Sequence, residues 1–208
     1  MTIKILNLYA GIGGNRKLWS GDIKVTAIEI DPLIANVYKT FFPDDEVIVA
    51  DAHQYLLEHF KEYDFIWSSP PCPTHSDIRR VRAEMGDLPI VYPDLKLYEE
   101  IILLTQFYSG KFVVENVIGY YKPLVEPQQL NRHYFWANFK IAQKRVKGVV
   151  IQHFNIPDFE KELGFDLSTF KGLDKRLVLR NCVNPRLGLH IFDCAFREKQ
   201  QTIGEIQK

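Results

Sequence analysis

Short apolar runs alternate along this chain with amphipathic stretches, and this alternation constrains the fold more than any other feature. Runs that are apolar throughout and end at glycine or a charged residue are typical of strands buried on both faces of a parallel sheet. They predict strands over residues 3–11, 24–31, 46–51, 63–69, 111–117, 133–141 and 148–154. The stretches between them predict helices over residues 15–21, 32–43, 52–62 and 94–110. This order indicates an α/β fold with a doubly wound, mostly parallel sheet.

The composition is ordinary for a globular chain and argues against several classes of protein. The 208 residues contain no long apolar span, and the N-terminal residues lack the pattern of a cleavable leader. The three cysteines, Cys72, Cys182 and Cys194, show no metal-ligand spacing. We therefore expect a cytoplasmic protein with no membrane attachment, no disulfide and no bound metal.

Charge is balanced in total but unevenly distributed. Residues 1–66 carry 6 Lys or Arg against 10 Asp or Glu, whereas residues 131–186 carry 11 against 5. A further group of arginines, Arg79, Arg80 and Arg82, follows the third proline of the sequence "SSPPCP". Such local excesses of positive charge can contact phosphates. On charge alone, a solvated surface without any partner is an equally good interpretation.

Four short motifs fall at the predicted carboxyl ends of strands, where ligands bind in sheets of this type. They are "YAGIGG", "EID", "SSPPC" and "ENV". In the first, Gly11, Gly13 and Gly14 would let the backbone approach a ligand, although a structural turn is as common an explanation. In the second, the carboxylate of Glu29 could accept hydrogen bonds from ribose hydroxyls, and Asp51 after the third strand could meet an adenine amino group. Either acid could instead cap a helix, but together they predict a pocket for an adenosine-bearing cofactor.

The sequence "SSPPCP" places Cys72 among Pro70, Pro71 and Pro73, which exclude an ordinary helix or central strand there. A thiol at the end of a sheet becomes a nucleophile if its thiolate is stabilised. The acid that would complement it is Glu115, which is expensive to bury in an otherwise apolar strand without a partner. Considered separately, Cys72 could be an inert core residue and Glu115 a member of a structural ion pair.

Taken in order, these blocks resemble the DNA (cytosine-5) methyltransferase family over nearly the whole chain. The matching blocks are "LNLYAGIGGNR", "AIEID", "VADA", "SSPPCPTHS", "VVENV", "RHYFWANF" and "LRNCVNPRLGLHIF". The resemblance implies a Rossmann-like catalytic domain whose C-terminal helix, residues 185–198, packs beside the first strand through Leu187, Ile191 and Ala195. It also implies S-adenosylmethionine as the cofactor and S-adenosylhomocysteine as the product.

The resemblance assigns roles to individual residues of this chain. Those implied to bind the cofactor are Tyr9, Ala10, Gly11, Gly13, Gly14, Glu29, Ile30, Asp51, Ala52, Pro70, Asn181 and Val183. Those implied in catalysis are Cys72, which would attack carbon 6 of cytosine, Glu115, which would hold or protonate nitrogen 3, Asn116, which would help fix the loop, and Arg132. The cytosine would be flipped out of the duplex to reach them.

The chain also departs from the family pattern at several positions. Pro73 and His75 replace the usual glutamine and phenylalanine, and Arg180 replaces the glycine of a "GN" pair. The family's two arginines correspond to Asn131 and His133, so Arg132 would have to support the pyrimidine oxygen from a shifted position. His133 could alternatively be a satisfied strand histidine.

The predicted division of the chain follows the same resemblance. Residues 1–139 form the catalytic, cofactor-binding domain, residues 140–178 a short target-recognition segment, and residues 179–208 a segment that returns to the catalytic domain. Only 12 residues separate "ENV" from "LNRHYFW", so one helix–strand unit is cut or replaced. We expect a short recognition site of about two to four base pairs, or reliance on an auxiliary protein, because phosphate contacts alone do not specify sequence. Residues expected to contact nucleic acid are Ser76, Arg79, Arg80, Arg82, Lys144, Arg145 and Lys147.

The resemblance implies a compact DNA methyltransferase of the kind suited to a bacterial or phage genome and to restriction-modification. Three other functions compete with this interpretation. One is a tRNA cytosine-5 methyltransferase. A second is an amino methyltransferase, because "SSPPC" resembles the SPP-aromatic block of that class, although an aromatic would then replace Cys72. The third is a non-catalytic relative that binds only DNA or the cofactor.

Overall fold

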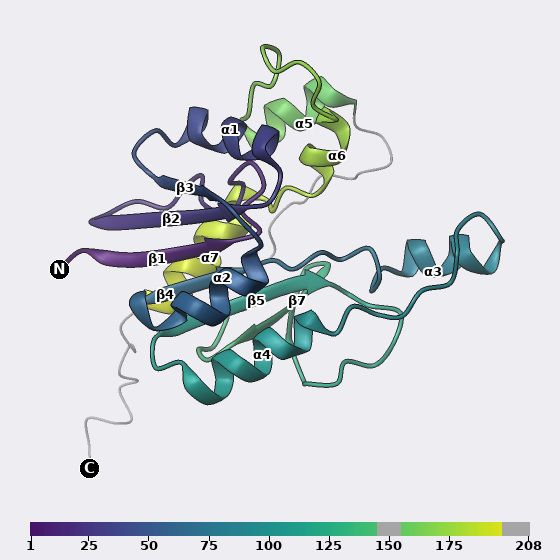
Figure 1. Ribbon diagram of the computed structural model, residues 1–208, viewed down its shortest axis with the longest axis horizontal. Coiled ribbons are helices and arrows are strands. Elements are labelled where there is room, and N and C mark those ends of the chain that lie inside the picture. The colour runs from purple at the N-terminus through teal and green to yellow at the C-terminus, as the bar shows by residue number, and fades with distance from the viewer. Residues whose placement is uncertain (145–154, 197–208) are drawn as a thin grey trace.

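In the part of the chain that the structure describes, seven strands form one sheet with helices on both faces (Figure 1). The computed structural model describes residues 1–144 and 155–196. The strand order is β3-β2-β1-β4-β5-β7-β6. The strands are β1 (Ile3–Leu8), β2 (Ile23–Glu29), β3 (Glu46–Val49), β4 (Phe65–Ser68), β5 (Lys111–Val117), β6 (Gln128–Leu130) and β7 (His133–Ala137). Strands β1 to β5 pair in parallel, whereas β7 pairs antiparallel with both β5 and β6. The predicted doubly wound, mostly parallel α/β fold is confirmed.

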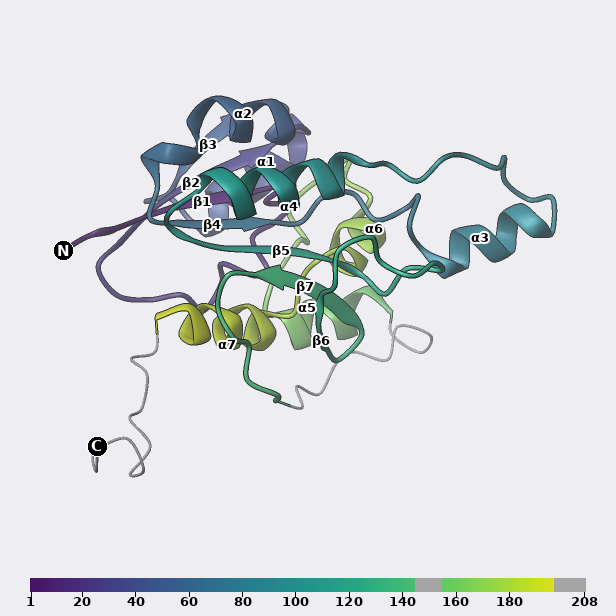
Figure 2. The ribbon, with the colours of Figure 1, turned by 90° about the horizontal axis from the view of Figure 1, so that it is seen from below.

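The helices divide between the two faces of the sheet (Figure 2). Helices α2 (Ala52–His59) and α4 (Lys96–Phe107) pack on one face, against the side chains of Leu6, Ile66 and Val114. Helix α7 (Pro185–Phe196) lies on the opposite face. Helix α1 (Pro32–Phe41) packs through Tyr38 against Ala27 of β2. A single-turn 3₁₀ helix, η1 (Phe60–Glu62), extends α2. Because β1 is covered on both faces, its buried apolar residues divide between two cores, with Ile5 in one and Leu6 and Leu8 in the other.

Helix α7 returns to the first strand, as the family resemblance implied. Its residues Leu187, Ile191 and Ala195 share a buried cluster with Ile5 of β1. The Trp19 indole adds a hydrogen bond of 3.2 Å from Nε1 to the Gly188 carbonyl. The described residues end with this helix at Phe196, so the predicted helical residues beyond it lie outside the description.

Two small helices, α5 (Ile156–Leu163) and α6 (Lys175–Arg180), pack together against α1, and the sequence analysis did not predict them. Helix α3 (Asp77–Glu84) was also not predicted, and it stands on an arm that projects away from the sheet (Figure 1). The strand predicted over residues 148–154 lies outside the described residues. The division of the chain at residues 139 and 178 stays a prediction.

The helix predicted over residues 15–21 is wrong, because these residues form tight turns. The turns are closed by hydrogen bonds from the Lys17 amide to the Gly14 carbonyl and from the Trp19 amide to the Arg16 carbonyl. Neighbouring side chains are held by different parts of the molecule: Asn15 bonds Asn7, and Arg16 bonds Asp45. The side chains of this segment are thus bound to separate parts of the molecule, and its backbone follows turns instead of a helix.

The segment after β5 lacks a helix but not a strand. Residues 118–127 contain no helix and lead directly into the short strand β6, so the helix of the helix–strand unit that was predicted to be cut is absent, whereas β6 and β7 complete the sheet. The following strand ends at Ala137 rather than at residue 141, and Asn138 turns the chain by bonding the Phe112 amide and the Gly110 carbonyl. No helix in the described ranges is long and apolar enough to span a membrane.

Candidate active site

The glycine loop after β1 leaves room for a ligand at only one of its glycines. Gly11, at φ +55°, faces open space where a side chain would be. A side chain on Gly13 would meet Phe42 and Tyr38, and one on Gly14 would meet Cys182 and the Val183 carbonyl. Gly13 and Gly14 therefore serve close packing of the loop, and only Gly11 offers backbone to a ligand. Ala10, beside it, is buried.

The packing of Gly14 also brings the distant C-terminal block to this loop. Residues 181–183 follow α6 directly, and Cys182 and Val183 lie against Gly14. Asn181 is exposed at the end of α6, where its amide donates to the Leu177 carbonyl. The predicted cofactor residues Asn181 and Val183 are therefore gathered beside the glycine loop.

The acidic side chains at the carboxyl edge of the sheet accept hydrogen bonds from backbone amides. Glu29 is nearly buried and accepts hydrogen bonds from the amides of Gly11 (2.9 Å) and Asp31 (3.0 Å). Asp51 caps α2 by accepting from the Gln54 amide, and this bond holds the pKa of the Asp51 carboxyl below its ordinary value. The capping alternative is thus realised for Asp51, which stays exposed, whereas Ala52 is buried as the first residue of α2. Beside Glu29, Ile30 exposes 65% of its surface, which is unusual for a large apolar side chain at the end of a central strand.

The loop that carries Cys72 is tied to the segment after β5. The Cys72 carbonyl accepts from the amides of His75 (3.0 Å) and Ser76 (3.1 Å), which closes a tight turn. The buried Asn116 side chain donates to the Pro70 carbonyl at 2.9 Å, which joins this loop to β5. Two elements far apart in sequence are thereby held in a fixed relation at the carboxyl end of the sheet.

A second set of contacts continues this link beyond Ser76. The Tyr120 amide donates to the His75 carbonyl at 3.2 Å, and the His75 Nδ1 is 2.7 Å from the Tyr121 hydroxyl. Ser76 and Gly119 pair as an isolated antiparallel bridge. Burial lowers the pKa of the His75 imidazole, which favours its neutral form. His75, which replaces the family's phenylalanine, thus anchors the loop by hydrogen bonding.

Cys72 and Glu115 lie near each other, because Asn116, next to Glu115, bonds the Pro70 carbonyl two residues before Cys72. Glu115 lies on β5, one residue beyond the last pair with β4, and is 8% exposed. Cys72 is half-buried, and its pKa is raised by burial and then by the negative charge of Glu115. The Glu115 carboxylate is therefore close enough to Cys72 to disfavour the thiolate.

The base beside Glu115 is His133, not Arg132. The His133 Nε2 lies 3.6 Å from the Glu115 Oε1, because residues 133 and 115 share one face of the β5–β7 pair. The other ring nitrogen, Nδ1, is buried and has no hydrogen-bond partner among the described residues. Arg132 lies in the β6–β7 turn with an exposed side chain, so the structure does not bring it to Glu115.

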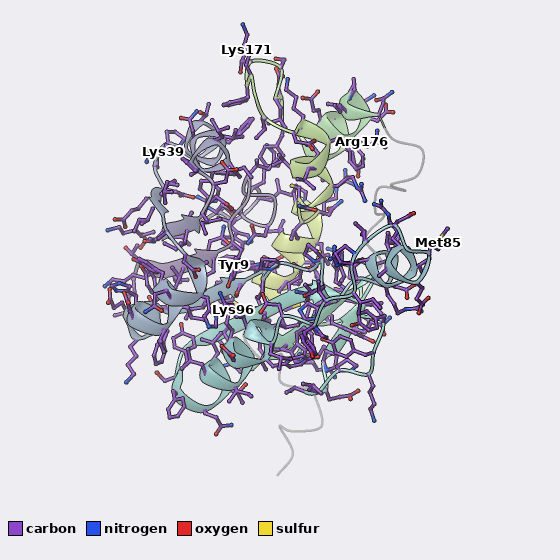
Figure 3. All side chains as sticks on the ribbon, turned by 45° about the vertical axis from the view of Figure 1, so that its right-hand side comes forward. Tyr9, Lys39, Met85, Lys96, Lys171 and Arg176 are labelled. Atoms are coloured by element: carbon purple, nitrogen blue, oxygen red, sulfur yellow. The ribbon has the colours of Figure 1, made fainter. Side chains whose placement is uncertain are left out.

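The arginines expected to contact nucleic acid lie on the projecting arm, whose outer end Met85 marks in Figure 3. Arg80 bonds Asp77 and Glu84, and Arg82 lies 3.6 Å from Asp87, so the arm balances much of its own charge. Arg79 makes a long contact of 3.5 Å with the Pro89 carbonyl. Ion pairs this exposed are weak and can exchange for phosphate partners. Lys144 is exposed, whereas Arg145 and Lys147 lie outside the described residues.

We expect the Asn116→Ala substitution to lower the free energy of unfolding by about 1–3 kcal/mol, because it leaves the Pro70 carbonyl without its buried donor. Urea denaturation followed by circular dichroism measures the change. Asn36→Ala, an exposed position on α1, is the matched control. A change of less than about 0.5 kcal/mol, the range of ordinary surface substitutions, would contradict this account of the loop.

Comparison with known proteins agrees with this geometry. Over 94% of its length the fold superposes on 98% of a methyltransferase from Entamoeba histolytica, EhMeth, with a TM-score of 0.50 at 11% sequence identity. The sheet, the glycine loop and the returning helix thus define the fold of an S-adenosylmethionine-dependent methyltransferase. A family model described as C-5 cytosine-specific DNA methylase matches residues 3–131, more than half of the chain. The protein belongs to this family, which uses S-adenosylmethionine as methyl donor and acts on nucleic acid.

The chain matches two curated methyltransferases over part of their length. It is 37% identical over 79 residues to the tRNA (cytosine(38)-C(5))-methyltransferase of Spodoptera frugiperda, covering 35% of this chain and 24% of that protein. It is 26% identical over 126 residues to the type II methyltransferase M1.HphI of Haemophilus parahaemolyticus, covering 56% of this chain and 33% of that protein. The chain therefore spans a quarter to a third of the length of these two relatives.

Proposed function

We propose that this protein transfers a methyl group from S-adenosylmethionine to carbon 5 of cytosine in double-stranded DNA. The observation that carries the proposal is the convergence of a half-buried thiol and a nearly buried carboxylate, Cys72 and Glu115, from two neighbouring strand ends. An amino methyltransferase would have no use for this pair. The match to a DNA methylase family model over residues 3–131 favours DNA as the substrate.

The residues at the sheet edge fit the cofactor. Gly11 faces open space, the carboxylate of Glu29 stands at the end of β2, and the exposed Ile30 offers an apolar surface for a base. We propose that these residues hold S-adenosylmethionine together with Tyr9, Asp51, Pro70 and the 181–183 segment. When bound, the cofactor supplies an electrophilic methyl group to carbon 5 of the cytosine.

Cys72 and Glu115 divide the work on the ring. As the Cys72 sulfur attacks carbon 6 of a flipped cytosine, its S–H proton leaves to water, and protonated Glu115 gives its proton to nitrogen 3. The addition makes carbon 5 electron-rich. After methylation the carbon-5 proton leaves to water, the carbon 5–carbon 6 double bond re-forms, the Cys72 sulfur is expelled as the thiolate, and nitrogen 3 returns its proton to Glu115. Protonation of Glu115 also removes the charge that opposes the thiolate, so the two events assist each other.

A tRNA substrate is the second candidate, favoured by the higher identity to the insect tRNA enzyme. Incubation with labelled S-adenosylmethionine and either duplex DNA or tRNA distinguishes the two. Label in DNA alone supports the proposal, label in tRNA alone replaces its substrate, and label in neither supports a binding-only relative. Bisulfite sequencing of host DNA after expression then reports the site. A site of about two to four base pairs is expected, because phosphate contacts position without specifying sequence, and a long interrupted motif would contradict this part.

We also propose that His133 is the cation that supports Glu115 and the pyrimidine during catalysis. His133→Gln should lower kcat by about tenfold, the effect of losing one contact between charged groups, because glutamine supplies no positive charge. His133→Arg should retain more activity than His133→Gln, because arginine is always charged.

The matched variant for this prediction is Arg132→Ala, in the adjacent turn. It should change kcat less than threefold. The Arg132 side chain is exposed, and Arg132 lies in the turn beyond the last residue pair of β5 and β7. Wild-type kcat in His133→Gln, together with a large loss in Arg132→Ala, would return the role to Arg132 as the sequence predicted.

A further inference from the structure

A fully buried carboxylate, Glu100 on α4, lies beneath the candidate cofactor site and takes no part in the mechanism above. It is 1% exposed and accepts three hydrogen bonds from three other elements. The Tyr9 hydroxyl donates to Oε1 at 2.6 Å, the Ser68 hydroxyl donates to Oε2 at 2.6 Å, and the His53 Nδ1 lies 3.0 Å from Oε1. We call Tyr9, His53, Ser68 and Glu100 the Glu100 cluster.

The Glu100 cluster joins the segments that build the two halves of the site. Tyr9 opens the glycine loop, and Ser68 is the last residue of β4, immediately before the loop that carries Cys72. His53 lies in the first turn of α2, next to the predicted cofactor-binding residues Asp51 and Ala52. Figure 3 shows Tyr9 near the centre of the molecule, well away from the outer end of the arm. The Glu100 carboxylate thus contacts three of the chain segments that surround the candidate cofactor site.

Tyr9 depends on this carboxylate more than an ordinary buried tyrosine would. Its backbone is left-handed, with φ +53°, a conformation that is uncommon for residues other than glycine, asparagine and aspartate. Such a conformation persists only where surrounding contacts over-determine it. Burial and Glu100 both raise the pKa of the Tyr9 hydroxyl, so it keeps its proton and remains a donor. The bond to Glu100 therefore fixes the tilt of the ring at the start of the glycine loop.

We propose that Glu100 is a positioning residue that sets Tyr9 for the cofactor, and that His53 is its counterion. This inference rests on the proposed cofactor site and goes beyond it, because it makes cofactor affinity depend on the protonation of His53. A buried carboxylate without a positive partner is costly, and hydrogen bonds from hydroxyls supply no charge. Among the described residues, His53 is the basic group that contacts Glu100.

The charged groups around His53 give the direction of the pH dependence. The hydrogen bond to Glu100 raises the pKa of His53, and Glu99, whose Oε2 is 3.1 Å from His53 Nε2, adds to this. Lys96 on α4 opposes the rise, and the Asp51 carboxylate at the start of α2 also interacts with His53. Below the raised pKa the imidazolium bridges both glutamates. Above it, Glu100 loses its counterion, and cofactor affinity should fall as the pH rises.

Titration calorimetry with S-adenosylhomocysteine tests the inference. We expect Glu100→Gln and Tyr9→Phe each to raise the dissociation constant about tenfold, the effect of losing one hydrogen bond to a charged group. The double variant should be no weaker than Glu100→Gln alone, because both substitutions remove the same interaction. Tyr9→Phe carries the test if Glu100→Gln does not fold. Glu58→Gln, an exposed position on α2, is the control and should bind as the wild type does.

Nuclear magnetic resonance titration of the cofactor-free protein measures the pKa of His53 directly, which a binding measurement cannot do. The pKa of His53 should lie above its ordinary value in the wild type and return toward that value in Glu100→Gln. In calorimetry, the wild-type dissociation constant should increase through the same pH range, and that of His53→Gln should stay flat. Wild-type affinity of Glu100→Gln for S-adenosylhomocysteine, or additive losses in the double variant, would overturn this inference but not the proposed function. Failure of the wild type to bind S-adenosylhomocysteine would overturn both this inference and the proposed function.

Discussion

Cys72→Ser should abolish methyl transfer, with a loss of kcat of at least about 10³-fold, within the range seen when an enzyme loses its nucleophile. Serine keeps the size of the side chain but not its reactivity, because its hydroxyl is far less acidic and its alkoxide is not accessible near neutral pH. The loop itself should survive. The Asn116 bond to the Pro70 carbonyl and the amide bonds to the residue 72 carbonyl involve no atom that the substitution changes.

The measurement is single-turnover methylation with labelled S-adenosylmethionine, on whichever nucleic acid the wild type accepts. Cys194→Ser is the matched control, because Cys194 lies on α7 beside His190 and away from the strand ends. It should retain wild-type activity. Equal activity in Cys72→Ser and the wild type would exclude covalent catalysis through this sulfur.

Glu115→Gln should lower kcat by about 10²–10⁴-fold, the usual contribution of a positioned general acid. Glutamine can still form a hydrogen bond to the pyrimidine, but it cannot give nitrogen 3 a proton. The same substitution should make Cys72 more acidic, since the charge of Glu115 contributes to the raised pKa of the thiol. Catalysis and thiol reactivity are therefore expected to move in opposite directions.

Alkylation of Cys72 by iodoacetamide, followed as a function of pH, measures the second effect. The inflection should move to lower pH in Glu115→Gln, so the modification rate near neutral pH rises while methyl transfer falls. Glu126→Gln, an exposed position after β5, should change neither. A slower alkylation rate in Glu115→Gln would mean that the carboxylate assists the thiolate in the free protein, contrary to the electrostatics described above.

The sheet could be predicted because its strands are buried on both faces. Runs such as "YDFIWSS" and "KFVVENV" leave no polar alternation, and each is followed by residues that end a strand. The same reasoning located the site, since parallel strands deliver their carboxyl ends to one edge. The roles of Cys72, Glu115 and Asn116 came from the family resemblance, and the residue chemistry agreed with them.

Other features depend on contacts that local patterns do not contain. The arm with α3 buries no residue of its helix, so its sequence carries no apolar stripe from which to predict one. The turns at residues 15–19 form because Asn15, Arg16 and Trp19 bond three distant segments. The position of His133 beside Glu115 follows from antiparallel register, in which residue 133 shares a face with residue 115 while Arg132 falls in the turn.

The Glu100 cluster was missed for a related reason. In the sequence, Glu100 is one of two adjacent acids on an amphipathic helix, and such residues are ordinarily solvated. Only its place on the buried face of α4, opposite Tyr9 and Ser68, distinguishes it from Glu99. A strict helical count from Leu97, Ile101 and Leu104, which are buried, puts residue 100 on the same face. This helical spacing is the sequence signal from which the burial of Glu100 could have been predicted.

The central claim is that the Cys72 sulfur and the Glu115 carboxylate act on a single extruded cytosine. Its most direct measurement is mass spectrometry of the protein after incubation with S-adenosylmethionine and duplex DNA in which every cytosine is replaced by 5-fluorocytosine. Fluorine cannot leave carbon 5 as a proton does, so the sulfur should stay bonded to carbon 6, and digestion should yield a nucleotide adduct on Cys72. An RNA of the same kind is tested in parallel. The absence of an adduct with either nucleic acid, in protein shown to bind S-adenosylmethionine, would contradict the claim.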